Sequence, residues 1–181
     1  MEIRIGAGGW AYFHVPGMDN LSAYSRAFDF VEVNSTFYEI PEYELVKSWR
    51  GRVPKDFEFS VRCHKSITHK HLLEPVNETI EAFNDMVKIC ELLGSEYLHI
   101  MTPPKMKLDS GRVKSIRDFL SSVTGRVRLA WEIRSLRNGL TADVIRIMED
   151  YNIIHCVDLS IQTPSIDSDV IYTRLFGKGH H

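Results

Sequence analysis

Acidic and basic side chains stand at the ends of several short apolar runs in this chain. A carboxylate can act as a general acid or base, and the fork of an arginine guanidinium matches the oxygens of a phosphate or carboxylate. The acids proposed as catalytic groups are Glu32, Glu132 and Asp158. These residue types predict proton transfer on a small anionic compound, which would be phosphorylated or sugar-like.

A second group of polar residues is predicted to bind that compound. The stretch Phe59–Leu73 holds arginine, lysine and three histidines but no acid, which favours an anion. With residues that follow other apolar runs, it supplies the predicted binding residues Trp10, Asn34, Tyr38, Arg62, His64, Lys65, Thr68, His69, Arg134 and Arg174. A metal is the alternative ligand of the histidines in this stretch, but their loop spacing is a weak signal. His99 and His155 lie within apolar runs and are interpreted as hydrogen-bonded core histidines.

Seven apolar runs rich in β-branched residues predict strands, and the segments between them have apolar residues at helical spacing. The strands are expected at Ile3–Ala7, Phe30–Asn34, Phe57–Arg62, Tyr97–Met101, Val127–Ile133, Ile153–Asp158 and Val170–Leu175. One strand per about 26 residues is typical of βα repeats with a parallel sheet. A doubly wound sheet and a TIM-like barrel both satisfy the pattern, and both gather functional groups at the carboxyl ends of their strands.

The composition excludes several classes of protein. With 44% hydrophobic and 25% charged residues, the chain is globular, and its length favours one domain. A net charge of −2 disfavours general nucleic-acid binding, and no apolar run approaches the length of a membrane span. The three cysteines, Cys63, Cys90 and Cys156, are far apart. We therefore expect no disulfide framework and a reducing, cytoplasmic location.

Several blocks along the chain resemble the YecE-like family, which is domain-of-unknown-function family 72. They are Gly6–Trp10, Glu32–Tyr38, Phe59–Arg62 followed by Ile67–His69, Trp131–Arg134 and Tyr172–Gly177, in the family's order. The resemblance implies a TIM-barrel-like α/β fold and no established reaction. Ala7 and Gly8 replace a hydroxyl pair of the family, and Phe176 replaces a histidine.

The same resemblance sets an expectation for the architecture. The family continues with a further strand and helix past the position of His181. Residues 1–181 are therefore expected to form a single parallel βα barrel domain without the family's last unit. With about seven strands it is short for the eight of a TIM barrel, so we expect it to be open or incomplete. An open edge predicts a homodimer that covers it.

These observations lead to one function and two alternatives. We expect an acid–base enzyme, a lyase, isomerase or hydrolase, in which Glu32 or Glu132 transfers the proton and the three arginines at strand ends hold the anion. The first alternative is a metal-dependent hydrolase, phosphodiesterase or nuclease, with both glutamates, Asp158 and a histidine as ligands of a divalent metal; no other cofactor is predicted. The second is a non-catalytic barrel that binds a ligand or, less favoured, nucleic acid. We also expect Glu32→Gln to leave folding nearly intact.

Overall fold

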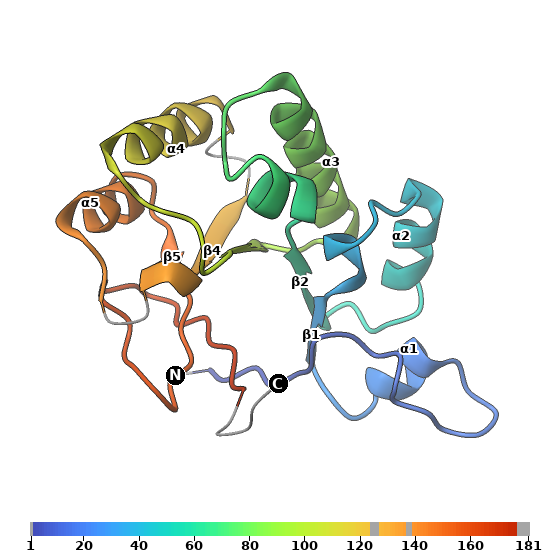
Figure 1. The fold of residues 1–181 in the computed structure, drawn as a ribbon. Coiled ribbons are helices and arrows are strands. Elements are labelled where there is room, and N and C mark those ends of the chain that lie inside the picture. The colour runs from blue at the N-terminus through green and yellow to red at the C-terminus, as the bar shows by residue number, and fades with distance from the viewer. Residues whose placement is uncertain (1, 124–126, 137–138, 177–181) are drawn as a thin grey trace.

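A curved parallel sheet forms the centre of the molecule. The computed structural model describes residues 2–123, 127–136 and 139–176. Its five strands lie in chain order and every neighbouring pair is parallel. They are β1 (Phe30–Val33), β2 (Glu58–Arg62), β3 (Tyr97–Thr102), β4 (Arg128–Ile133) and β5 (Ile154–His155). Figure 1 shows the sheet curving around an inner space, with the helices on its outer side.

The helices alternate with the strands, as the apolar spacing predicts. They are α1 (Asn20–Tyr24), α2 (Tyr43–Arg50), α3 (Asn77–Leu93), α4 (Ser110–Val123) and α5 (Ala142–Asp150). The longest, α3, ends at Gly94, whose φ of 66° is the left-handed conformation that glycine adopts without strain. Apolar side chains of α2 to α5 and the outer side chains of the strands form one core; Val31, Val61 and Leu98 are each fully buried there.

The inner face of the sheet is polar. Side chains alternate between the two faces of a strand, so the register decides which residues share the inner space. It sets Glu32 beside Ser60, Arg62 beside His99, and Met101 beside Glu132. Residues from four neighbouring strands therefore face one another, and a small apolar cluster with Tyr172 packs against them.

The structure has fewer strands than the seven predicted. The segments 3–7 and 170–175 are not strands, and the sixth predicted strand is reduced to β5. Ala7 accepts one backbone hydrogen bond from Glu32, and Thr173 forms an isolated parallel bridge with Val157. A strand needs a continuous ladder of backbone hydrogen bonds, and each segment has only a few. A closed barrel is therefore not confirmed by the described residues.

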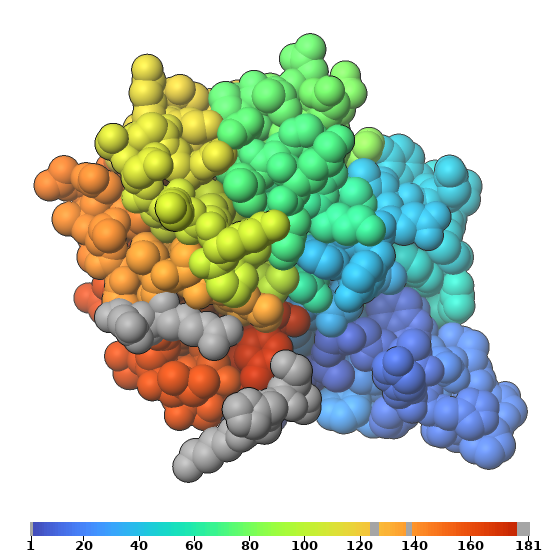
Figure 2. Space-filling model, in the orientation of Figure 1, coloured from blue at the N-terminus to red at the C-terminus, as the bar shows by residue number. Residues whose placement is uncertain are grey.

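The two terminal segments lie next to each other on the side of the molecule between β1 and β5, in blue and red in Figure 2. They expose large apolar side chains: Ile3, Ile5, Ile171 and Leu175 are each more than 60% exposed. Apolar side chains along a poorly paired edge are the feature that a neighbouring chain would cover, so the homodimer stays a prediction. In the described part of the chain, no helix has both the length and the apolar character to cross a membrane.

Candidate functional site

A buried histidine lies between two carboxylates in the inner space. The His99 side chain, on β3, is fully buried. Its Nδ1 lies 3.2 Å from Glu32 Oε2 on β1, and its Nε2 lies 3.4 Å from Glu132 Oε2 on β4. The Glu32 side chain is 5% exposed and that of Glu132 13%. Glu132 is therefore the more accessible of the two acids.

Two arginines complete the ion pairs of these acids. Arg174 bridges them, with Nη2 3.2 Å from Glu32 Oε1 and Nη1 2.9 Å from Glu132 Oε2. Arg134 Nε donates to the other oxygen of Glu132 at 2.7 Å. Burial alone would raise the pKa of Glu132, but contacts with His99 and Arg134 hold it well below its usual range. For Arg174 burial acts in the other direction and would lower the pKa, but the charges of Glu32 and Glu132 outweigh it, and the pKa is raised.

Tyr172 closes the inner space from the side of the C-terminal segment. Its hydroxyl donates to Glu32 Oε2 at 2.8 Å and lies 2.7 Å from Ser60 Oγ. Its ring is stacked on the His99 ring, with 5.6 Å between centroids. Burial, followed by the charge of Glu32, raises the pKa of Tyr172 well above its usual value. The hydroxyl therefore stays protonated and acts as a donor to the carboxylate.

Arg62 differs from the other two arginines. Within the described residues no carboxylate lies within 4.0 Å of its guanidinium, which donates to Asn34 Oδ1 at 3.2 Å and stacks over the Phe37 ring at 4.1 Å. Its Nε is buried without a hydrogen-bond partner. Burial, and then the charge of Arg174, lower the pKa of Arg62. Glu32 and Glu132 act on its pKa in the opposite direction and more weakly, from beyond ion-pair distance.

The rim above Arg62 contains further basic groups. Thr68 Oγ1 lies 2.8 Å from His69 Nδ1, and the His69 ring packs edge-on against Phe37. Burial lowers the pKa of His69, and the nearby charges of Arg62, Arg134 and Lys105 lower it further. The rim is therefore positive where the predicted anion would approach.

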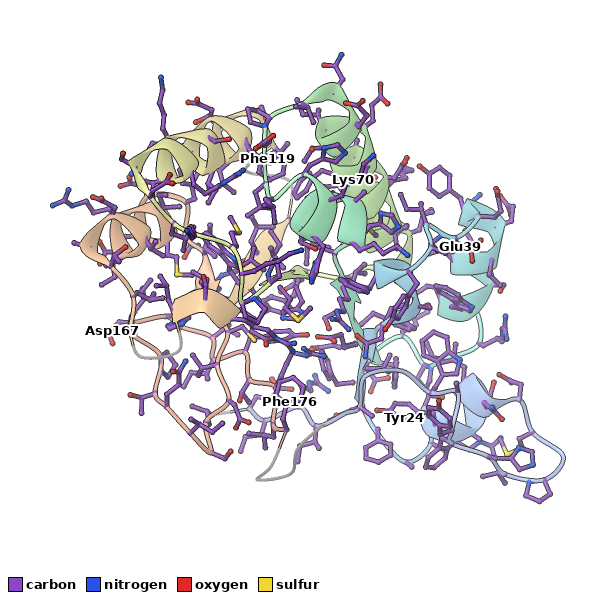
Figure 3. All side chains as sticks on the ribbon, in the orientation of Figure 1. Tyr24, Glu39, Lys70, Phe119, Asp167 and Phe176 are labelled. Atoms are coloured by element: carbon purple, nitrogen blue, oxygen red, sulfur yellow. The ribbon has the colours of Figure 1, made fainter. Side chains whose placement is uncertain are left out.

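Phe176 packs against two of these arginines. Its ring lies 5.0 Å from the Arg174 guanidinium and 5.6 Å from that of Arg134, and it is labelled in Figure 3. The Phe176 ring covers the guanidinium groups of Arg134 and Arg174. Arg62, at the end of β2, is stacked on Phe37 instead.

Some residues of the predicted site lie outside this cluster. Asp158 uses its carboxylate within its own loop, where it accepts hydrogen bonds from Ser160 and from the Phe176 backbone. His64 contacts Ser66 and the Tyr38 carbonyl, and Lys65 lies over the Tyr38 ring. Trp10 packs edge-on against Trp49. The two glutamates and the three arginines are thus brought together, whereas Asp158, His64, Lys65 and Trp10 make their contacts elsewhere.

The site residues proposed from the sequence did not include Ser60, His99 or Tyr172, which belong to this cluster. His99 was interpreted as a core histidine, and it is buried, but its ring nitrogens face carboxylates and not backbone. His155 fits that interpretation, since its Nδ1 accepts the Ser165 backbone N–H. The signal that finds His99 is alternation: the register partners on β2 and β4 place it on the same face as Arg62.

The sequence as a whole matches one family. The model of the family described as "Protein of unknown function DUF72" covers residues 4–181. The chain belongs to this family. Within DUF72, the UPF0759 protein YecE of Escherichia coli K12 is 26% identical over 119 residues, which are 65% of this chain and 42% of that protein.

Two solved DUF72 proteins share the fold. One, from Enterococcus faecalis V583, is 18% identical, with a TM-score of 0.69 over 87% of this chain and 61% of its own. The other, from Thermotoga maritima MSB8, is 21% identical, with a TM-score of 0.68 over 86% and 64%. This DUF72 chain therefore spans less than two thirds of the length of the relatives that it matches.

Proposed function

We propose that this chain binds a small anionic compound, phosphorylated or carboxylated, at the carboxyl ends of its strands, and that it transfers a proton to or from that compound. The proposal makes it an acid–base enzyme of the lyase, isomerase or hydrolase type. Arg62 is the main anchor of the anion, with Arg134 and Arg174 beside it. Glu132 is assigned as the proton acceptor because it is the more accessible of the two acids.

The observation that carries the proposal is the unpaired state of Arg62. A half-buried charge is stable where it is paired and hydrogen-bonded. Among the described residues, Arg62 contacts one amide oxygen, one sulfur and one aromatic ring, and no carboxylate within 4.0 Å. Arg134 and Arg174 already have carboxylate partners. A phosphate or carboxylate would supply the charge and the acceptors that Arg62 lacks.

The charge of the cluster supports the same conclusion. The cluster contains three guanidinium groups and two carboxylates, so it has excess positive charge before any contribution from Lys105. The excess lies on Arg62, because Arg134 and Arg174 are paired with carboxylates, so a ligand of negative charge is favoured beside Arg62. Asn34 holds Arg62 through its Oδ1 and donates from Nδ2 to the Gly8 carbonyl at 3.1 Å, so the anchor is fixed in position.

The test is stabilisation by inorganic phosphate, measured as the melting temperature across a phosphate titration at constant ionic strength. At twenty times its Kd, phosphate should stabilise the wild type by about 1.8 kcal/mol, which is about 4–7 °C. Arg62→Met should lose most of this shift. Arg26→Met, in which an exposed arginine is replaced, should keep it. Equal shifts in the two variants would refute the role of Arg62.

A further inference from the structure

Three potential metal ligands meet in the inner space, below the arginines. One ligand atom each of His99, Glu132 and Cys156 lies within 4.8 Å of the others. The three residues come from β3, from β4 and from the position directly after β5. His99 and Cys156 are buried, at 0% and 2% exposure. An imidazole, a carboxylate and a thiol are the ligand types that zinc prefers.

The hydrogen bonding of His99 points to an absent ligand. Both of its ring nitrogens are buried, and neither has a hydrogen bond of good geometry, although each faces a carboxylate oxygen. Buried polar atoms in folded proteins almost always have partners. The ring is therefore available for a different interaction: its Nε2 faces Glu132, and a ring nitrogen, a Glu132 oxygen and Cys156 Sγ lie within 4.8 Å of one another.

The spacing suits a shared ion. Ligand nitrogen and oxygen atoms lie about 2.0–2.2 Å from zinc, so tetrahedral angles separate them by about 3.3–3.5 Å. His99 Nε2 and Glu132 Oε2 are 3.4 Å apart. On the other side of the ring, Glu32 lies 3.2 Å from Nδ1. A carboxylate in that position fixes the orientation and tautomer of a metal-bound histidine.

We propose that His99 Nε2, Glu132 and Cys156 Sγ bind one divalent transition-metal ion of the zinc type, with Glu32 holding the histidine. The fourth position of a tetrahedral ion is left for a small ligand. This inference goes beyond the anion site and does not rest on it. It replaces the ligand set expected from the sequence, in which Asp158 took part.

Arg174 is the competitor of this ion. In the metal-free protein its guanidinium contacts both Glu32 and Glu132 and supplies the positive charge between them. Burial raises the pKa of the Cys156 thiol, so the sulfur is protonated in that form. When the ion binds, the thiol proton leaves to solvent and Arg174 moves away from Glu132. Glu132 is then a ligand, and in the metal-free protein it is a proton acceptor.

Titration with Co²⁺ alone tests the site, because a thiolate bound to cobalt gives a near-ultraviolet charge-transfer band. The wild type should show this band and saturate at one equivalent. Cys156→Ala should lose it, whereas Cys90→Ala, in which another buried cysteine is replaced, should keep it. Arg174→Gln should bind Co²⁺ about ten-fold more tightly, a change of 1.4 kcal/mol, because the competing charge is gone.

A second variant keeps the test decisive if Cys156→Ala folds poorly, as judged by circular dichroism. His99→Gln leaves the thiol in place and removes the nitrogen ligand, so its Kd for Co²⁺ should rise at least ten-fold. A wild type without the band would overturn the proposal, and so would a band that survives in Cys156→Ala. Unchanged affinity in His99→Gln would have the same meaning. The phosphate response of Arg62 is independent of each of these results.

Discussion

Replacing Tyr172 with phenylalanine removes a single oxygen atom from the centre of the inner space. That hydroxyl donates to Glu32 Oε2 at 2.8 Å and lies 2.7 Å from Ser60 Oγ, and Tyr172 is 8% exposed. It is a buried polar link between the C-terminal segment and the sheet, beside the ion pairs of Arg174. The ring itself remains in Tyr172→Phe, so its stacking on His99 is retained.

The size of the effect follows from the partner. A hydrogen bond to a charged group contributes about 1.5–3 kcal/mol, and the variant also leaves a buried carboxylate oxygen with one donor fewer. We expect Tyr172→Phe to lower the free energy of unfolding by about 2 kcal/mol. For a chain of this size that is a fall in melting temperature of about 4–8 °C. Urea denaturation followed by circular dichroism and a thermal scan should agree.

Tyr151→Phe is the matched control. The Tyr151 hydroxyl bonds to Ser121 Oγ and to the Arg117 carbonyl near the surface, where water can replace it. Its loss should cost less than about 0.5 kcal/mol. Equal stabilities for Tyr172→Phe and the wild type would show that the C-terminal segment is not docked in the sheet as described.

Two further predictions concern stability, and a third concerns phosphate binding. Glu32→Gln should lose about 3 kcal/mol in urea denaturation, because it breaks a buried pair with Arg174; this revises the expectation from sequence, and an unchanged stability would restore it. Burial lowers the pKa of His155, so its contribution to stability is present above the unfolded pKa of about 6.5 and is lost as the pH falls. His155→Gln should therefore lose less stability than the wild type between pH 7 and pH 5, and parallel curves would contradict this. A Cβ at position 8 would lie 2.3 Å from Asn34 Nδ2, so Gly8→Ala should displace Asn34, which holds Arg62, and weaken the stabilisation by phosphate. An unchanged stabilisation by phosphate would contradict the role of Asn34 in positioning Arg62.

The sequence predicts the helices and the four longer strands because their apolar spacing reports local packing. It overestimates the strands at the two ends of the sheet, since strand formation depends on a neighbour that spacing does not reveal. Segments 3–7 and 170–175 have the composition of strands and only partial pairing. Composition shows that a segment is able to form a β-strand, but a strand forms only where a neighbouring segment supplies the backbone hydrogen bonds.

In the candidate site, too, some residues could be predicted from the sequence and others could not. Polar residues at strand ends, such as Glu132 and Arg174, stand out from their apolar neighbours, and the structure brings them together. Asp158 has the same position in the sequence but folds back into its own loop. His99 is concealed by the apolar residues on either side of it, and only the pairing of β3 with β2 and β4 shows which face it shares.

Crystals soaked in selenate, an anomalously scattering tetrahedral anion, test the central claim most directly. An anomalous peak is predicted within hydrogen-bond distance of the Arg62 guanidinium in the wild type, and it should be missing from crystals of Arg62→Met. A wild-type crystal with selenate only at exposed arginines, and none beside Arg62, would contradict the assignment of this rim as an anion site.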